Sequence, residues 1–285
     1  MKVIRASVLG FCMGVRKAVD IASGAARGYP VYTIGPLIHN PAVLSNLEKL
    51  GIKSAGDVSG LKDSDVIIRA HGVSPDTEKA LKENGCRIID ATCPNVKKNQ
   101  LTAQELSRGG YHLFLAGEKE HAEITGLLGY CAEAVFCQTA ADARQAENAA
   151  KKLYKKNKDA KTALIGQTTI SMEEYDAAAK KIKKYFPDLK IINTICAATG
   201  ERQNALRELL PLSDAVLVAG GKQSANTRRL LMIARQSGKP CAVVQSAQEI
   251  PLKFFSFNTV GICAGASTPD FVIDEIEKSL IRVCL

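Results

Sequence analysis

The sequence predicts an α/β protein with parallel sheets covered by helices, and three observations support this prediction. Short β-branched and apolar runs alternate with amphipathic stretches along the whole chain, which is the pattern of strands and crossover helices. Several amphipathic stretches begin with a capping residue followed by proline. With 285 residues, the chain is also long enough for one large domain or two to three small ones.

The predicted strands are short runs rich in valine, isoleucine and leucine, bounded by polar or glycine-containing segments. Buried strands of parallel sheets have this continuous apolar character because helices cover both faces. In chain order the runs are Val31–Ile34, Val66–Ile68, Leu113–Leu115, Ala163–Ile165, Ala215–Val218, Cys241–Val244 and Val260–Cys263.

Helix starts are predicted at 40–41, 74–76 and 268–270, where Asn40, Ser74 and Thr268 precede a proline. The pair 84–85, Asn-Gly, ends the second of these helices, and Ser171 with Glu174 forms a predicted capping box. The lysine-rich stretch 151–161 is predicted to end a helix and enter a turn. Its simplest interpretation is a solvated helix face, and the alternative is a nucleic-acid contact.

The composition excludes a disordered or collagen-like chain, because 46% of the residues are hydrophobic and 24% are charged. Lys and Arg outnumber Asp and Glu by 38 to 29, which gives a net charge of +9. Nine cysteines, an odd number, argue against a closed disulfide framework and favour a reducing, cytoplasmic location. We expect no signal peptide, and no membrane span because no apolar run reaches about 18 residues.

Polar side chains gather where predicted strands end and helices begin. His39, His71 and Ser267 stand just before helix starts, and the turns 220–227 and 265–269 are led by glycine and rich in hydroxyl or amide groups. Parallel sheets place their ligands at the carboxyl ends of strands, and helix N-termini favour anions. The recurrence predicts a polyanionic ligand. The Walker spacing is absent from the sequence, so no P-loop is expected.

Three cysteines differ from the other six. Cys12, Cys93 and Cys196 each follow a predicted strand and precede a helix, one in each third of the chain, as equivalent positions of a repeated unit do. A helix N-terminus favours the thiolate, the form that binds metals. Three thiolates without a Cys-x-x-Cys pair fit a zinc ion with an open fourth position or an iron–sulfur cluster with one iron lacking a protein ligand. The alternative is three unrelated buried cysteines.

The remaining cysteines lie in apolar surroundings and are predicted to pack as small hydrophobic residues. A metal role is the alternative for the two that flank the segment 132–136. The six are Cys86, Cys131, Cys137, Cys241, Cys263 and Cys284.

An acidic residue near a metal-bound hydroxyl can donate the proton that makes water a leaving group. Glu123, two residues after His121, is the candidate, and the alternative is an ordinary acid in a polar loop. The hydroxyls of Thr168 and Thr169 end another predicted strand and can relay that proton, although Thr169 can equally start the next helix.

Along essentially its whole length, the chain resembles the 4-hydroxy-3-methylbut-2-enyl diphosphate reductases, the last enzymes of the non-mevalonate isoprenoid pathway. The resemblance is specific because nine motifs occur in one order. They lie at Gly10–Val15, His39–Asn40, Ala70–Ser74, Asp90–Pro94, His121–Glu123, Gln167–Thr169, Thr194–Thr199, Ser224–Asn226 and Ala264–Asp270.

The resemblance implies three α/β lobes with parallel sheets in a pseudo-threefold arrangement around a central iron–sulfur cluster. We expect lobes at 13–92, 93–192 and 193–285, with 1–12 packing on the third. The implied cofactor is one 4Fe-4S cluster with three cysteine ligands, Cys12, Cys93 and Cys196, and one open iron.

The implied reaction is a reductive removal of the substrate's allylic hydroxyl, which gives isopentenyl diphosphate, dimethylallyl diphosphate and water. Ferredoxin or flavodoxin is the implied electron donor. By the same resemblance, Glu123 delivers protons, and Thr168 contacts the substrate and helps to position that delivery. The residues implied to hold the diphosphate are His39, His71, His121, Ser224, Asn226 and Ser267.

Three positions depart from the family pattern. Leu9 stands where arginine is frequent, Ala122 where proline is usual, and Ala225 where serine is frequent. The last departure removes one phosphate-binding hydroxyl. A competing hypothesis is a zinc-containing or metal-free protein that binds phosphate or RNA, favoured by the basic charge and the lysines at 151–161. We expect a small diphosphate as the ligand, with neither a membrane nor a nucleic acid as partner.

Overall fold

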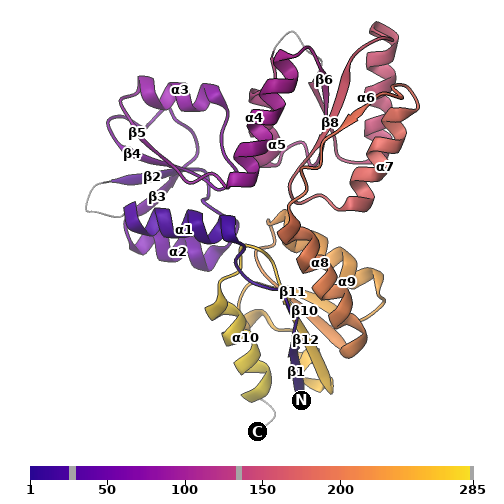
Figure 1. Cartoon of the computed structure of the whole chain (residues 1–285). Coiled ribbons are helices and arrows are strands. Elements are labelled where there is room, and N and C mark those ends of the chain that lie inside the picture. Colours follow the sequence, from indigo (N-terminus) through magenta and orange to yellow (C-terminus); the bar gives the residue numbers. More distant parts are fainter. Residues whose placement is uncertain (26–29, 133–136, 283–285) are drawn as a thin grey trace. The chain divides into compact units, whose positions relative to one another are not determined.

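The strands of the computed structural model form three four-stranded sheets, and the structure describes residues 1–25, 30–132 and 137–282 (Figure 1). The first sheet has the order β3-β2-β4-β5. Its pairs β2–β4 and β4–β5 are parallel. The strands are β2 (Val31–Ile34), β3 (Ile52–Ala55), β4 (Asp65–Ile68) and β5 (Arg87–Asp90).

Helix α3 (Pro75–Glu83) packs on the first sheet through Leu81, which is buried with Val66 and Ile68. The hydroxyl of Ser74 accepts a hydrogen bond from the Thr77 N–H at 3.2 Å. The predicted cap is therefore confirmed, and it fixes where the loop after β4 turns into a helix.

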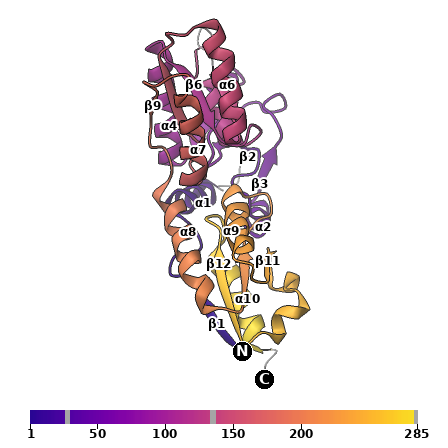
Figure 2. The same ribbon diagram turned by 90° about the vertical axis from the view of Figure 1, so that its right-hand side faces the viewer.

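The second sheet has the order β7-β6-β8-β9, and its strands are parallel. Helices α6 (Ala143–Lys156) and α7 (Met172–Lys183) lie side by side on one face, around Phe114 and Leu164 (Figure 2). Helices α4 (Pro94–Arg108) and α5 (Ala122–Gly129) cover Leu113 and Leu115 on the other. The strands are β6 (His112–Ala116), β7 (Cys137–Ala140), β8 (Thr162–Gly166) and β9 (Lys190–Ile191).

The capping box at the start of α7 is confirmed. The Ser171 hydroxyl accepts from the Glu174 N–H at 3.1 Å, and the Glu174 carboxylate accepts from the Ser171 N–H at 3.0 Å. Both otherwise unpaired donors of the first turn are thereby satisfied.

The third sheet has the order β11-β10-β12-β1, again parallel. Its strands are β1 (Lys2–Arg5), β10 (Ala215–Ala219), β11 (Cys241–Val244) and β12 (Thr259–Ala264). Helices α8 (Ala197–Leu209) and α9 (Ala225–Gln236) pack on one face through Leu206 and Leu230. The other face carries α10 (Asp270–Arg282). Short 3-10 turns occur at Leu210–Leu212, Ala247–Glu249 and Leu252–Ser256.

The three sheets share one topology. If the four strands of each sheet are numbered in the order of the chain, their order across the sheet is 2-1-3-4. In the third sheet, β10, β11 and β12 are strands one to three, and the N-terminal strand β1 takes the place of strand four. Cys93 follows β5, Cys196 follows β9 and Cys12 follows β1, so each of these cysteines comes after the fourth strand of a sheet. The repeated unit inferred from the cysteine positions is therefore present in the strand order.

The chain divides into two compact units. The three-segment unit comprises Met1–Ala26, Ile38–Ile52 and Ala197–Leu285, and it holds the third sheet with α1 (Met13–Ala25) and α2 (Pro41–Lys49). The two-segment unit, Arg27–Leu37 and Lys53–Cys196, holds the first and second sheets. The lobe boundaries expected at 92–93 and 192–193 stay a prediction.

One local prediction was wrong. The residues directly before Cys12 are not a strand, because β1 ends at Arg5 and Gly10 adopts a positive φ of 77° in the loop that follows. The helix start predicted at 268–270 is confirmed, because α10 begins at Asp270, but Thr268 does not directly precede the helix, and its hydroxyl donates to the Ala219 carbonyl at 2.9 Å. Among the described residues, no helix is both long and apolar enough to cross a bilayer.

Candidate active site

The three candidate ligand cysteines make the same backbone contact in their respective sheets. The N–H of each donates to a carbonyl in the loop after the third strand, from Cys12 to Ala266 at 3.1 Å, from Cys93 to Ala70 at 3.0 Å and from Cys196 to Thr168 at 2.9 Å. All three thiols are half-buried. They directly precede α1, α4 and α8.

Within the two-segment unit, a hydrogen bond connects the loops of two of these cysteines. Asn95 lies two residues after Cys93, and its side-chain amide donates to the Sγ atom of Cys196 at 3.2 Å. Nearby, the amide of Asn99 donates to the Thr194 carbonyl at 3.3 Å. The first turn of α4 therefore holds the segment that carries Cys196.

Ion pairs fix the same turn of α4 to its neighbours. Lys97 lies 3.2 Å from Glu78 and 3.4 Å from Asp90. Burial opposes the charge of Lys97, but its hydrogen bond to the Glu78 carboxylate and the charges of both carboxylates outweigh burial and raise the pKa of Lys97. Lys97 therefore stays a cation and ties α4 to α3 and β5.

In the three-segment unit, buried Arg202 supports the loop that carries Cys12. Its guanidinium donates to the Gly10 carbonyl at 2.6 Å and to the Ala198 carbonyl at 2.8 Å. Both acceptors lie two residues from a candidate ligand, Cys12 and Cys196 respectively. Arg202 thus joins the Cys12 loop to the first turn of α8.

Two of the candidate diphosphate ligands meet in the two-segment unit. The rings of His71 and His121 are edge to face, with centroids 5.3 Å apart. Nδ1 of His121 accepts from the Glu123 N–H at 3.3 Å and caps α5. A neutral His121 ring therefore carries its hydrogen on Nε2, from which it can donate to an anion.

Glu123 is only 1% exposed, and its carboxylate is bound by Thr168. Its Oε1 accepts from the Thr168 N–H at 2.8 Å, and its Oε2 accepts from the Thr168 hydroxyl at 2.7 Å. The structure thus joins the predicted proton donor to the predicted relay residue. Thr168 also accepts from the Cys196 N–H through its carbonyl, at 2.9 Å.

Gln100 supports the loop that carries His71. It is fully buried on α4, and its amide donates to the Val73 carbonyl at 3.5 Å. A Cβ on Gly72, whose φ is +71°, would collide with that amide. The positive φ favours glycine beside His71, and a larger residue would also have to displace the Gln100 amide.

His39 and Ser267 meet in the three-segment unit, where the Ser267 hydroxyl donates to the His39 carbonyl at 3.4 Å. A Cβ on Gly221 would collide with the same carbonyl. Asn40 follows and caps α2 by accepting from the Val43 N–H at 3.2 Å. The glycine at 221 lets the loop after β10 approach the His39 backbone this closely.

Ser224 and Asn226 stand at the start of α9. The Ser224 hydroxyl caps the helix by accepting from the Thr227 N–H at 3.3 Å. Asn226 is 3% exposed, and neither its Nδ2 nor its Oδ1 has a hydrogen-bond partner among the described residues. Buried polar atoms are rarely left unpaired in native proteins, so this amide is suited to a polar ligand.

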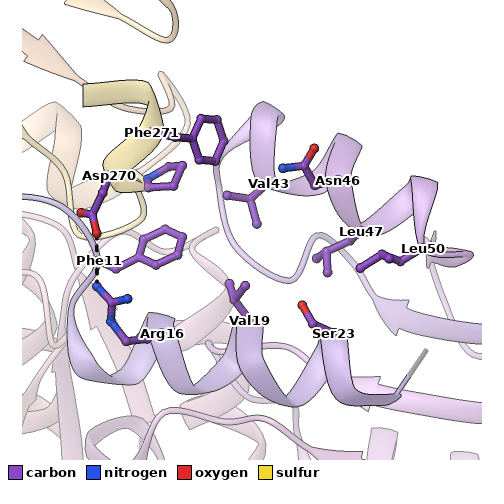
Figure 3. A pocket seen from close by; sticks show the side chains of 11 residues that line it. Phe11, Arg16, Val19, Ser23, Val43, Asn46, Leu47, Leu50, Asp270 and Phe271 are labelled. Carbon is purple, nitrogen blue, oxygen red and sulfur yellow. Dashed lines mark ion pairs between the residues drawn. The ribbon is translucent and has the colours of Figure 1, made fainter. Parts of the chain in front are cut away.

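A separate groove of about 330 Å³ lies within the three-segment unit, lined by α1, α2 and the start of α10 (Figure 3). Phe11 and Phe271 line it, and Arg16 forms an ion pair with Asp270 at 3.6 Å across its rim. The groove adjoins Cys12 through Phe11, but the candidate site residues do not line it.

The predicted site residues fall into two groups. The two-segment unit holds Cys93, Cys196, His71, His121, Glu123 and Thr168, and the three-segment unit holds Cys12, His39, Ser224, Asn226 and Ser267.

Of the cysteines predicted to pack in the core, Cys86 and Cys263 are buried, and burial raises the pKa of Cys263 to about 12. Cys284 lies outside the described residues.

Sequence reasoning missed Asn95, Gln100 and Arg202. Asn95 and Arg202 lie shortly after candidate ligand cysteines, and that proximity was the available signal. The sequence left two roles open for Thr169, a proton relay or the start of the next helix, and α7 begins only at Met172 with Ser171 as its cap. Thr169 lies three residues after the third strand of its sheet, as His71 and Ser267 do in theirs. Thr169 accepts from the Gln167 amide at 2.8 Å.

Comparisons with known proteins agree with one another. Residues 3–281 match the family model described as LytB protein. The 4-hydroxy-3-methylbut-2-enyl diphosphate reductase of Treponema denticola is 41% identical over 293 residues, covering 99% of this chain and 100% of that one. The enzyme of the same name from Aquifex aeolicus is 35% identical over 289 residues, covering 99% and 96%.

Solved structures give the same answer. The E-1-hydroxy-2-methyl-but-2-enyl-4-diphosphate reductase of Plasmodium falciparum matches with a TM-score of 0.89 and 26% identity, over 100% of this chain and 88% of that one. A second structure, of an (E)-4-hydroxy-3-methyl-but-2-enyl diphosphate reductase described as the terminal enzyme of the non-mevalonate pathway, matches with a TM-score of 0.71 and 35% identity, over 99% and 100%. The chain belongs to the LytB protein family, whose named relatives are 4-hydroxy-3-methylbut-2-enyl diphosphate reductases.

Proposed function

We propose that this protein reductively removes the allylic hydroxyl of 4-hydroxy-3-methylbut-2-enyl diphosphate. Two electrons and two protons are consumed, the C–O bond breaks, a C–H bond forms, and isopentenyl or dimethylallyl diphosphate leaves with one water. The observation that carries the proposal is the buried Glu123 carboxylate bound by the Thr168 hydroxyl at 2.7 Å. A reaction that expels water needs such a proton source.

We further propose that Cys12, Cys93 and Cys196 hold one 4Fe-4S cluster. Their setting fits the cofactor, because each half-buried thiol precedes a helix and the Cys196 sulfur already accepts a hydrogen bond from the Asn95 amide. Three ligands would leave one iron open. When bound, such a cluster supplies electrons and a Lewis-acidic iron.

The proton path runs through two side chains in this proposal. When Glu123 is protonated, the hydrogen bond to Thr168 reverses, so that Oε2–H donates to Oγ1 and the hydroxyl hydrogen of Thr168 turns to the departing substrate oxygen. Oε2 then gives its proton to Oγ1 as Thr168 passes its own hydrogen to that oxygen. The backbone N–H of Thr168, 2.8 Å from Oε1, keeps the carboxyl oriented during the transfer. Burial of Glu123 excludes bulk water, so protons are delivered along a defined route.

The diphosphate is assigned to groups that present hydrogen-bond donors. His121 offers Nε2–H at the N-terminus of α5, and Ser224 and Asn226 stand at the N-terminus of α9. The unpaired amide of Asn226 supports this assignment most directly. His39, His71 and Ser267 complete the proposed set.

Replacing Asn226 with leucine should raise KM about 10- to 100-fold, because a hydrogen bond to a charged group contributes about 1.5–3 kcal/mol. The same substitution removes two buried polar atoms that lack partners, so the urea midpoint should stay constant or rise. Steady-state kinetics and urea unfolding of the variant test both expectations. An unchanged KM, or a lowered urea midpoint, would show that Asn226 has a structural role instead.

We propose ferredoxin or flavodoxin as the electron donor, and the cytoplasm as the location. Both carriers are acidic, and the net charge of +9 favours encounter with an acidic partner. The odd number of cysteines supports a reducing compartment.

Metal analysis under strict exclusion of oxygen tests the proposed function. We expect about four iron and four sulfide per chain, and substrate-dependent oxidation of reduced methyl viologen, ferredoxin or flavodoxin with release of the two diphosphate products. Zinc, iron and sulfide should be determined on the same sample. Stoichiometric zinc without sulfide would overturn the proposal and favour a zinc-containing phosphate- or RNA-binding protein.

A further inference from the structure

Asn95 is a polar residue in the first turn of α4, directly after Pro94. Its amide nitrogen lies 3.2 Å from Sγ of Cys196, a residue 101 positions away in the sequence. Asparagine is a poor helix former, so helix stability does not explain its presence at this position. The long-range contact to a sulfur atom does.

The direction of this hydrogen bond follows from the chemistry of the two groups. A thiolate has no hydrogen to donate and can only accept, and the amide NH₂ is a donor. Asn95 therefore stabilises negative charge on the Cys196 sulfur. The effect is strongest when the sulfur is deprotonated, which is the form that binds iron.

We propose that Asn95 is a positioning residue that orients the Cys196 thiolate and raises the reduction potential of the cluster. This inference rests on the proposed function. Hydrogen bonds to ligand sulfurs are a recognised control of cluster potential, because each added electron places more negative charge on the sulfurs. The donor therefore favours the reduced cluster over the oxidised one.

The neighbouring Asn99 provides a matched control. It lies one helical turn further along α4, and its amide also donates to the segment before Cys196, but to the Thr194 carbonyl at 3.3 Å and not to a sulfur. A residue that merely holds this segment should behave like Asn99. Substitution of a residue that acts on the sulfur should change the reduction potential of the cluster, whereas substitution of Asn99 should leave that potential unchanged.

The experiment compares the parent, Asn95→Leu, Asn95→Asp and Asn99→Leu, each with its cluster reconstituted without oxygen. Leucine has nearly the same shape but no donor, and an ionised aspartate places negative charge beside the sulfur. The midpoint potential is measured by electron paramagnetic resonance while dithionite supplies one electron per cluster. Iron content and circular dichroism show that each variant is folded and loaded.

We expect the potential to become more negative in Asn95→Leu, with the ratio of reduced to oxidised cluster at fixed potential falling up to about tenfold, or about 59 mV for one electron. The shift should be larger in Asn95→Asp and absent in Asn99→Leu. Unchanged potentials in both Asn95 variants, equal shifts at positions 95 and 99, or Asn95 variants that cannot be loaded while Asn99→Leu can, would overturn the tuning role.

Different results would overturn the proposed function and the inference about Asn95. A parent protein that binds no cluster would overturn the proposed function, and this inference with it. A parent protein that binds the cluster and turns over substrate, with Asn95 variants at the parent potential, would overturn the inference alone.

Discussion

Turnover of the Glu123→Gln variant is expected to fall about 100- to 10,000-fold, the usual contribution of a positioned general acid. Glutamine has the size of glutamate and can still accept from the Thr168 N–H, now 2.8 Å from Oε1. It has no acidic proton to deliver, so the chemical step fails while the loop keeps its shape. Substrate affinity and iron content should therefore stay near those of the parent.

The variant should be tested by single-turnover kinetics on cluster-loaded protein and by calorimetric titration with substrate. Glu120→Gln is the matched control, because Glu120 lies in the same loop but is exposed. It should keep the parent rate. Near-normal turnover in Glu123→Gln would remove Glu123 from the mechanism, and equal losses in both variants would indicate a general effect of charge on the loop.

The sheet strands could be predicted because their signal is local. The apolar runs at 31–34, 215–218 and 260–263 each became a strand or the body of one. Periodicity does not say which strands pair, however, and β1 joins β12 although 253 residues separate Arg5, the last residue of β1, from Thr259, the first residue of β12. The loop before Cys12 was misjudged because its apolar residues surround Gly10, whose positive φ turns the chain.

The residues of the candidate site also divide into those with a local signal in the sequence and those without one. Cys93, His121 and Glu123 were found from their positions at strand ends and helix starts, which is a local signal. Asn95 and Arg202 act on loops 101 and 192 residues away in the sequence, so their roles appear only once the chain is folded. Residue types selected for chemistry are visible in a sequence, whereas residues that support them depend on the tertiary contact.

Serine in place of Cys12, Cys93 or Cys196 should abolish turnover and lower the iron content of the isolated protein. The serine hydroxyl is a hard donor that stays protonated at neutral pH, whereas iron–sulfur clusters are held by soft thiolates. In the proposed site three cysteines hold the cluster, so the loss of one would leave two irons without a cysteine ligand. We therefore expect a loss of at least about 1,000-fold in turnover for each variant, the scale of a metal centre's contribution.

Cys86→Ser and Cys241→Ser are the controls, measured by iron and sulfide analysis, visible absorption and turnover. Cys86 packs in the core of the first sheet and Cys241 beside the core of the third sheet, and neither follows the fourth strand of a sheet as the three proposed ligands do. Both should keep about four iron per chain, with some loss of stability at Cys86 because a hydroxyl replaces a buried thiol. If all five variants lose iron alike, the division of the cysteines by their place in the repeat is wrong. If one of the three predicted ligands can be replaced without loss of iron, that cysteine is not a ligand, although it follows the fourth strand of its sheet.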